Sequence, residues 1–248
     1  VVGRYRFHIV NAIGKVFHSF DFLENSSNQT ALPQLSTVQQ LRERNGKIYF
    51  DSYPDVDAFK VKQVASSKIK MIYDINEGSF EYEMKYPTQY HENVYGYNFL
   101  YVYSTFNEEK EKFVYSFPAD EKLYVYNRNH SDFDSFQAKS KFFSLHSTGM
   151  TDLTNDYQNY TRYYVTHPSY SYLYYDKYRK VYYRVALKAN SLEEYNEGKG
   201  WKNASIIILN ENFEKIGESE IDEYVAMSMA FITPEGFYAT KADPNEEN

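Results

Sequence analysis

Apolar and polar residues alternate over many short segments of this chain, and a period of two predicts β-strands. The alternation is clearest in KIKMIYDI (68–75) and KFVYSF (112–117), where every second side chain can face a core. The chain is therefore expected to be essentially all-β. Further strands are predicted in GKIYFDSY (46–53), NFLYVYS (98–104), TRYYVTH (161–167) and GFYATKA (236–242).

One pattern occurs four times: an alternating strand, an Asn or Asp at its end, a short polar turn and a second strand. Asn and Asp tolerate left-handed backbone and hydrogen-bond to nearby amides, so they often close hairpins. Each copy is therefore predicted to be a β-hairpin. The closing residues are Asn11, Asp74, Asn127 and Asn210, in FHIVNAIGKVFHSF, KMIYDINEGSFEYE, LYVYNRNHSDFDSF and IIILNENFEKIGES.

The spacing of these hairpins favours a propeller. The closing residues lie 63, 53 and 83 positions apart, and each interval is near one four-stranded blade of about 40–50 residues plus an insertion. We predict a single β-propeller, or part of one, over residues 1–248, with about five four-stranded antiparallel blade-like repeats. The natural protein is expected to continue beyond one or both ends. A two-sheet β-sandwich with long hairpins is the alternative.

Two short helical insertions interrupt the strands. In STVQQLRERNG (36–46), Ser36 and Gln39 form a capping box and Gly46 stands where a helix ends. In SLEEYNEGKG, Ser191 and Glu194 repeat the capping box. The polar segment 144–159 is predicted to be the longest loop, a common place for binding residues.

The segment SYSYLYYDKYRKVYYR has seven tyrosines among sixteen residues, from Ser169 to Arg184. The rings either pack between neighbouring sheets or form an aromatic platform for a ligand. Strict alternation places Tyr170, Tyr172 and Tyr174 on one face of the first strand. The candidates for the platform are Tyr170, Tyr172, Tyr174 and Trp201. On the return strand, the face predicted to be core carries Val181, Tyr183, Val185 and Leu187.

The amino-acid composition argues against disorder, a nucleic-acid partner and a membrane-spanning segment. Low mean hydropathy, -0.68, does not mean disorder here, because the chain has 28 Tyr and 18 Phe to fill a core. The formal charge of -7 disfavours a nucleic-acid partner, which needs an excess of Lys and Arg on one face. No window holds the roughly 18 apolar residues of a membrane span.

The sequence offers few candidates for chemistry. Cysteine is absent, which excludes disulfides and zinc thiolates, and no motif predicts a cofactor. The six histidines make no zinc-binding motif, and 34 acidic residues are too many to single out a glycosidase pair. Alternate carboxylates are weak candidates for a calcium site, with solvated turn residues as the main interpretation. These carboxylates are Asp55, Asp57, Asp132 and Asp134.

Three phrases resemble a known family: FVYSFPADEKLYVYN (113–127), YYDKYRKVYYRVAL (174–187) and WKNASIIILNENFEKIGES (201–219), the last followed by ITPEGFYA (232–239). They are similar to segments of uncharacterised, propeller-like lipoproteins of Bacteroidota, a family of unknown function. The likeness covers most of the chain, from about Gly46 to Thr240. It implies a six- or seven-bladed propeller on a lipid anchor outside this chain, periplasmic or at the cell surface. It supplies no catalytic residue.

The function favoured at this point is a non-enzymatic binding or scaffolding module of the cell envelope. Propellers bind ligands at the mouth of the central channel, so a glycan or peptide is expected there, by analogy of fold. One alternative is a carbohydrate-active hydrolase or lyase, which needs two carboxylates or a His/Tyr pair together in one pocket. Another is a structural subunit that binds a partner protein through an exposed apolar patch.

Overall fold

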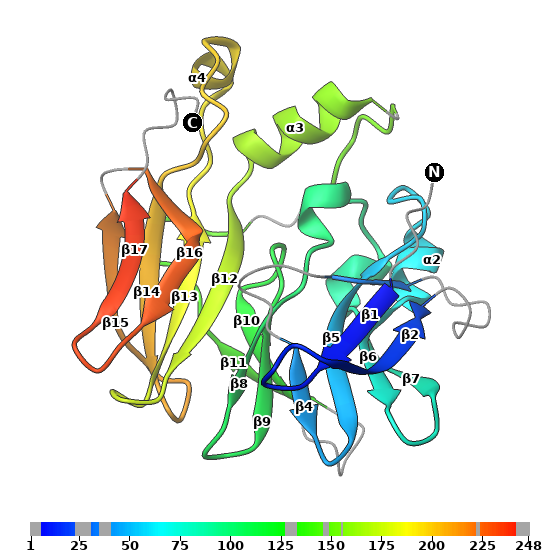
Figure 1. Ribbon diagram of the computed structural model, residues 1–248. Helices are drawn as coiled ribbons and strands as arrows, with labels where there is room; N and C mark the ends of the chain where they lie inside the picture. The colour runs from blue at the N-terminus through cyan, green and yellow to red at the C-terminus, as the bar shows by residue number, and fades with distance from the viewer. Residues whose placement is uncertain are drawn as a thin grey trace.

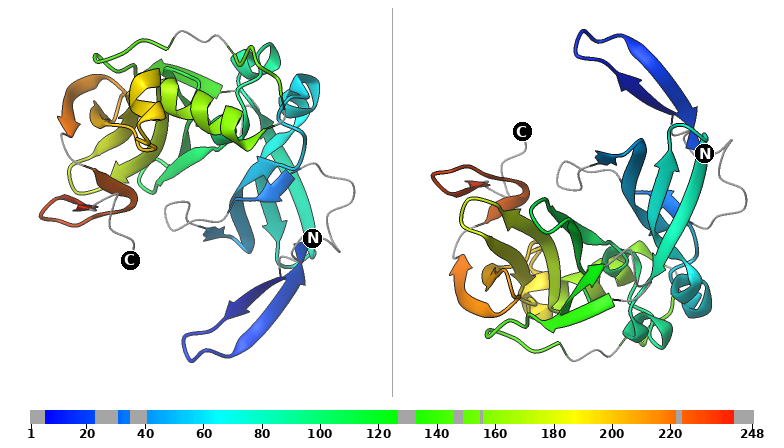
Figure 2. Two further views of the ribbon diagram at one scale, coloured as in Figure 1. Left: turned by 90° about the horizontal axis from the view of Figure 1, so that it is seen from above. Right: turned by 90° about the horizontal axis from the view of Figure 1, so that it is seen from below.

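A computed structural model of the protein describes residues 6–22, 31–34, 41–126, 133–145, 149–154, 156–221 and 224–241. Within these residues the fold is all-β, as the alternation predicts. It has three antiparallel sheets of four or five strands, two separate two-stranded hairpins and a few short helices. The sheets follow one another along an arc (Figures 1 and 2). No helix in this part of the chain is long and apolar enough to cross a membrane.

The first hairpin, β1 (Arg6–Val10) and β2 (Val16–Asp21), projects from the rest of the molecule (Figure 2). Asn11 closes it, because its Oδ1 accepts hydrogen bonds from the backbone N–H groups of Ile13 and Lys15. The predicted role of this Asn is therefore confirmed.

The first sheet has five strands, and Asp74 closes one of its hairpins. The Oδ1 of Asp74 accepts hydrogen bonds from the N–H groups of Asn76 and Glu77. Helix α2 (Val61–Ser66) connects two of the strands. The strands are β3 (Ala31–Pro33), β4 (Arg42–Arg44), β5 (Lys47–Pro54), β6 (Lys68–Asp74) and β7 (Ser79–Lys85), in the order β3-β5-β6-β7 with β4 also paired to β5.

The second and third sheets are antiparallel meanders, in which each strand pairs with the next along the chain. Asn210 closes a hairpin of the third sheet by accepting from the N–H groups of Asn212 and Glu214. The predicted closing residue of the second sheet, Asn127, lies outside the described residues. The second sheet contains β8 (Tyr103–Asn107), β9 (Lys112–Ser116), β10 (Lys122–Tyr126) and β11 (Phe133–Gln137), and the third contains β12 (Ser169–Asp176), β13 (Val181–Leu187), β14 (Ala204–Asn210) and β15 (Lys215–Ile221). A last hairpin follows, with β16 (Val225–Ile232) and β17 (Phe237–Lys241).

The hydrophobic core lies between consecutive sheets. One cluster joins Ile69 of the first sheet to Tyr115 of the second, and another joins Leu123 of the second to Ile207 of the third. The return strand β13 has both faces buried in such clusters, and its predicted core face packs toward β16 and β17. Burial of apolar area at each sheet-to-sheet contact is the main force that holds the arc together.

Arg184 locks the second sheet to the third. This β13 side chain is fully buried, and its guanidinium lies 3.6 Å from the centroid of the Tyr170 ring. Burial lowers its pKa to about 10, so it remains charged at neutral pH. Four oxygens accept its hydrogen bonds: Ser116 Oγ and the carbonyl oxygens of Asp120, Glu121 and Ala138.

One predicted strand is wrong, and another begins later than predicted. The segment TRYYVTH belongs to helix α3 (Tyr157–Thr166), because Asp156 caps its first turn by accepting from the N–H of Gln158. The helix buries Tyr160 and Val165. NFLYVYS begins as the short 3-10 helix η2 (Tyr97–Phe99), on which α3 packs, and the strand starts only at Tyr103. In both segments, aromatic residues that favour strands lie in helices, where Phe99 of η2 contacts Tyr163 and Tyr164 of α3.

One of the two predicted helices is confirmed. Ser191 and Glu194 form the capping box of α4 (Leu192–Asn196). The other prediction is wrong in its described part: β4 occupies Arg42–Arg44, and Gly46, with φ of 75°, lies in the tight turn to β5. Ser36 and Gln39 lie outside the described residues. A second 3-10 helix, η1 (Thr88–His91), completes the fold.

Candidate functional site

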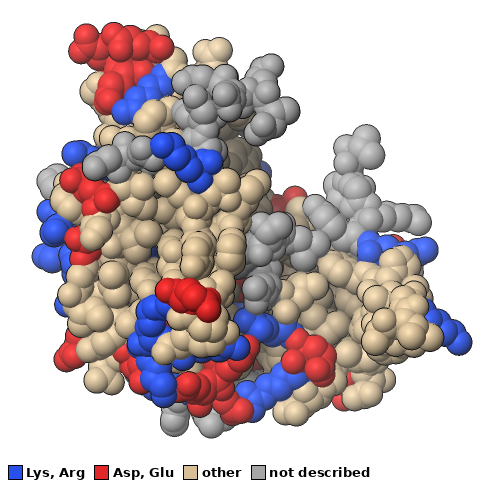
Figure 3. Space-filling view, turned by 60° about the vertical axis from the view of Figure 1, so that its left-hand side comes forward, with Lys and Arg blue, Asp and Glu red and all other residues tan. Residues whose placement is uncertain are grey.

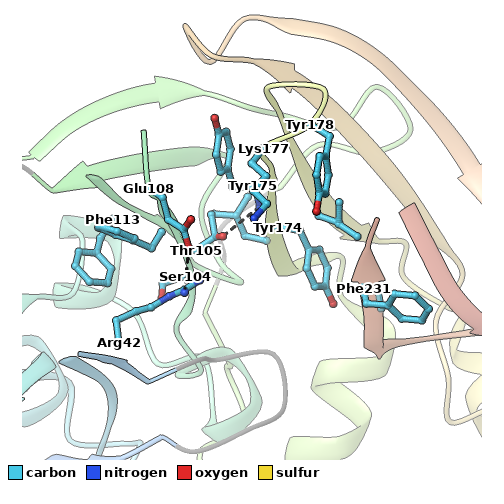
Figure 4. A pocket seen from close by; sticks show the side chains of 14 residues that line it. Arg42, Ser104, Thr105, Glu108, Phe113, Tyr174, Tyr175, Lys177, Tyr178 and Phe231 are labelled. Atoms are coloured by element: carbon cyan, nitrogen blue, oxygen red, sulfur yellow. Dashed lines mark hydrogen bonds and ion pairs between the residues drawn. The ribbon is translucent and has the colours of Figure 1, made fainter. Parts of the chain in front are cut away.

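A cavity of about 370 Å³ lies where edge strands of successive sheets meet (Figure 4). β8 contributes Ser104, Thr105 and Phe106, and β12 contributes Leu173, Tyr174 and Tyr175. β16 supplies Ala230, Phe231 and Ile232, and β4 supplies Arg42. Segments far apart in the sequence therefore build one concave surface, which is the arrangement expected of a ligand site.

Aromatic rings form much of the cavity wall. Tyr174 is nearly buried and its hydroxyl donates to the carbonyl oxygen of Met227, so this ring is fixed. Tyr178 and Phe231 are 48% and 57% exposed at the edge of the cavity. The Phe231 ring stacks on Tyr238, with centroids 5.4 Å apart, and points away from the other lining residues (Figure 4). A hydrogen bond of 3.1 Å from the N–H of Tyr175 to Thr105 Oγ1 holds β12 against β8 (Figure 4). The wall is therefore pre-formed, with two exposed rings available to a ligand.

Charged side chains flank the rings. Arg42 Nη1 pairs with Glu108 Oε1 at 3.3 Å, and both residues line the cavity (Figure 4). Lys177, in the turn between β12 and β13, lines the same space. The site thus combines apolar faces with hydrogen-bond donors, which is the composition that orients a polar ligand.

A buried polar pair lies behind the cavity. Ser104, which lines the space, donates its hydroxyl hydrogen to the carboxylate of Asp51. Burial raises the pKa of Asp51 to about 6, against the opposing effects of the Ser104 hydrogen bond and the nearby Lys70 charge. Asp51 and Lys70 are cross-strand partners on β5 and β6. The hydrogen bond to Asp51 holds the Ser104 hydroxyl in place, so its hydrogen points toward the protein and away from the cavity.

A second cavity of about 490 Å³ adjoins the first across Arg42, Phe106, Glu108 and Phe113, which line both. The second cavity is also lined by Lys70, whose Nζ lies 3.0 Å from the centroid of the Phe113 ring. The same ammonium group donates to the Tyr115 hydroxyl at 3.1 Å. A cation held among aromatic rings therefore sits between the first and second sheets.

The tyrosine platform is not assembled as alternation predicts. A register shift on β12 between Tyr170 and Leu173 moves Tyr170 to the opposite face from Tyr172 and Tyr174. A β-bulge of this kind reverses which side chains share a face, so the predicted shared face is wrong for Tyr170 and confirmed for Tyr172 and Tyr174. Tyr170 is buried under Arg184, where its hydroxyl accepts from the N–H of Ser140.

The other aromatic candidates are divided differently: Tyr172 and Tyr174 are neighbours, with ring centroids 6.5 Å apart, and Trp201 lies elsewhere. Tyr174 lines the first cavity, whereas Tyr172 packs outside it against Tyr103, with ring centroids 5.0 Å apart. Trp201 lies beside Tyr224 with the Lys199 ammonium 4.8 Å from its ring centroid, and it lines neither cavity. Of the four candidates, the structure places Tyr174 alone among the lining residues of these two cavities.

The weak calcium candidates are dispersed. Asp55 is exposed, and Asp57 accepts from the N–H of Phe59 in the approach to α2. Asp134 is exposed on β11, and Asp132 lies outside the described residues. Across the described ranges, no three His, Cys, Asp or Glu side chains come together as a metal site.

The described histidines make structural contacts. His8 shares a hydrogen bond with Ser19, and His18 with the Tyr73 hydroxyl. His91 and His167 bond to backbone carbonyl oxygens, and none of these four lines the two cavities described above. His130 and His146 lie outside the described residues.

Several lining residues were not singled out by the sequence. Arg42 fell inside a predicted helix, and Ser104 at the end of a strand predicted without a role. Phe231 lies next to the quoted phrase ITPEGFYA, but nothing local distinguishes it. Lys177 and Tyr178 lie in the tyrosine-rich segment SYSYLYYDKYRKVYYR, between its two strands.

Comparisons with known proteins extend this picture. A family described as a domain of unknown function, DUF4221, matches residues 10–220. The crystal structure of a DUF4221 family member from Bacteroides vulgatus is similar, with a TM-score of 0.75 and 21% identity. The match covers 95% of this chain and 67% of the other. This likeness concerns the fold alone. A comparison with curated proteins found no match.

Proposed function

The chain belongs to the DUF4221 family, and from this premise we propose that it is a non-enzymatic ligand-binding module built as part of a β-propeller. The proposal takes the sheets as blades. In a propeller, radially repeated antiparallel sheets place one edge strand each at a central channel. The cavity formed by β4, β8, β12 and β16 supports this, because each of these strands comes from a different sheet or hairpin.

The observation that carries the proposal is the pair of exposed rings at this cavity. Tyr178 and Phe231 come from different sheets and remain about half exposed while most other rings in the cores are buried. Exposed aromatic rings beside fixed polar groups are typical of recognition surfaces. We take a glycan or a peptide as the ligand class, in line with the expectation from the sequence.

The proposal also includes a location. The resemblance to propeller-like lipoproteins implies a periplasmic or cell-surface module held by a lipid anchor outside this chain. A binding module in that place would meet glycans and peptides before they enter the cell.

The enzyme alternative receives less support. It needs two carboxylates, or a His/Tyr pair, facing one another in a pocket. Among the described residues that line the first cavity, Glu108 is the carboxylate, and Arg42 pairs with it. The buried carboxyl of Asp51 behind the cavity bonds to Ser104, and that of Asp176 pairs with Arg179.

A partner-binding subunit is a second candidate, and the hairpin β1–β2 favours it. Ile13 and Phe17 are 86% and 63% exposed on a hairpin that projects from the body (Figure 2). Replacing both with Ser should abolish partner binding through the hairpin while leaving ligand binding at the cavity intact, which separates the two functions.

The test of the main proposal is a thermal-shift screen of the purified protein against neutral oligosaccharides, acidic oligosaccharides and peptides. A ligand at 100 times its dissociation constant adds about 2.7 kcal/mol to the unfolding free energy. For a chain of this size that raises Tm by about 5–10 °C.

Two variants locate the site. We expect Tyr178→Ala and Phe231→Ala to reduce the ligand-induced rise in Tm, because each removes an exposed ring from the rim. Tyr157→Ala is the matched control, since Tyr157 is 78% exposed on α3 and lines neither of the two cavities described. Silence across all three ligand classes would refute a binding function for these ligands, and an unchanged response in both rim variants would refute the cavity as the site.

A further inference from the structure

The turn between β8 and β9 places two glutamates on two arginines of β4. Glu108 pairs with Arg42 at 3.3 Å, and Glu111 forms an ion pair with Arg44. All four residues line the second cavity, and the Arg42–Glu108 pair lines the first as well. In Figure 3, acidic and basic side chains alternate along the lower edge of the molecule, where Figure 1 places the hairpin turns. The Arg42–Glu108 pair therefore borders both cavities, and the Arg44–Glu111 pair borders the second.

The arginines are built more firmly into the site than the glutamates. Side-chain exposure is 34% for Arg42 against 56% for Glu108, and 42% for Arg44 against 59% for Glu111. Both arginines lie on a strand that is paired along its length to β5, whereas both glutamates lie in a turn. Water screens charges at this exposure, so such pairs contribute little to stability. Another carboxylate can therefore replace the glutamates at small cost.

A third cation lies deeper in the second cavity. Lys70 is 1% exposed, held by the Tyr115 hydroxyl and by the ring of Phe113. Together with Arg42 and Arg44 it gives this cavity three cations from the first sheet. The guanidinium groups match carboxylates in geometry, because they offer two parallel N–H donors.

The walls favour sugars over peptides. The cavities adjoin, and the wall between and beyond them is aromatic, with Phe106, Phe113, Tyr178 and Phe231. Pyranose rings present apolar C–H faces that lie flat on such rings. One mode of peptide binding, extension of an open strand edge, is restricted at β8, because its edge lies against β12, where Thr105 accepts a hydrogen bond from Tyr175.

Resting on the proposed function, we propose that the ligand is an acidic glycan whose carboxylates replace those of Glu108 and Glu111 at Arg42 and Arg44. While the cavity is empty, the Glu108 and Glu111 carboxylates of the β8–β9 turn neutralise the two arginines. A glycan carboxylate that binds displaces them.

The first experiment is calorimetric titration of the whole chain with a short oligogalacturonate and with its methyl ester, at low and high salt. The two probes share their sugar rings and differ in carboxylate charge. We expect the acidic form to bind about tenfold more tightly at low salt, and the difference to shrink at high salt because ions screen the contacts.

The second experiment uses matched variants of one turn. Glu108→Gln removes a carboxylate from Arg42, while Glu109→Gln removes one that pairs with Lys180 at 2.9 Å and lines neither cavity. Both changes alter the net charge equally. We expect Glu108→Gln to tighten binding of the acidic probe about threefold or more, since the competing carboxylate is gone, and Glu109→Gln to leave it unchanged. Arg42→Gln should remove the preference for the acidic probe.

The outcomes separate this inference from the proposed function. Equal binding of acid and ester would keep a glycan-binding module and refute the acidic ligand. If Glu108→Gln and Glu109→Gln change the affinity for the acidic probe equally, only the net charge of the protein matters. That result would refute the displacement of Glu108 by the ligand at Arg42. Binding of acidic peptides in place of both sugar probes would refute the glycan. Failure of every sugar and peptide probe would refute the proposed function itself.

Discussion

Lys70 and Arg184 are two buried cations at two sheet interfaces, and they produce different interiors. Each is at most 1% exposed, and each lies against the face of an aromatic ring. Arg184 joins the second and third sheets, where it donates to four oxygens. Lys70 lies between the first and second sheets, among the rings of Phe113, Tyr49 and Tyr126.

The difference follows from the shapes of the two groups. A planar guanidinium has five donors and can satisfy several carbonyl oxygens at once, so it closes the space around it. The ammonium group of Lys70 is compact and faces mainly rings, and it lines a cavity of about 490 Å³, whereas Arg184 lines neither of the cavities described. At these two interfaces, then, four oxygen acceptors surround Arg184 and the space is closed, whereas aromatic rings surround Lys70 and the space beside it stays open.

The largest expected effect is at Arg184. Replacing Arg184 with Ala leaves buried carbonyl oxygens without donors and opens a void, so we expect the unfolding free energy to fall by about 3–5 kcal/mol. Urea unfolding measures this. Arg184→Lys should recover only part of the loss, because an ammonium cannot reach all four oxygens. Full recovery with Lys would show that charge alone matters at this interface.

A smaller effect is expected at Lys70. Lys70→Met keeps the length of the side chain among the rings but removes the charge that faces Asp51, so we expect a loss of about 2 kcal/mol. The double variant with Asp51→Asn should recover about half of it, because no uncompensated carboxylate then remains. A double-mutant cycle measures this coupling. A loss of unfolding free energy in Lys70→Met as large as that in Arg184→Ala would contradict the difference described between the two interfaces.

The smallest expected effect is a pH dependence of stability at Asp51. Burial raises the pKa of this carboxyl to about 6 in the folded protein, so the folded state binds the proton more tightly than the unfolded state does. Stability relative to Asp51→Asn should therefore be lost as pH rises from about 4 to about 6 and stay constant above that. Thermal melts of both proteins across this range give the difference. A constant difference throughout would show that Asp51 titrates normally.

The hairpins could be predicted from sequence because their determinants are local. Asn11, Asp74 and Asn210 close their turns through their own side chains, within four residues along the chain. The capping box of Ser191 and Glu194 is equally local. Such contacts depend on short-range chemistry that a sequence displays directly.

The errors arose where contacts are long-range. Helix α3 was predicted as a strand because its tyrosines favour strands, and its packing on Phe99 could not be read from the segment itself. The shift between Tyr170 and Leu173 reverses a face without a Gly or Pro to mark it. The candidate site required Arg42, Tyr178 and Phe231 to meet from three separate regions, and a single sequence does not show which strands become neighbours.

The position of Trp201 also makes the protein convenient for optical work. It is the single indole in 248 residues, and its ring neighbours are Tyr224 and Lys199, away from both cavities. Emission excited at the red edge of indole absorption therefore reports on that corner of the third sheet and not on the cavity. The native fluorophore can serve as a silent internal reference, while Phe231→Trp would install a second emitter where a ligand arrives.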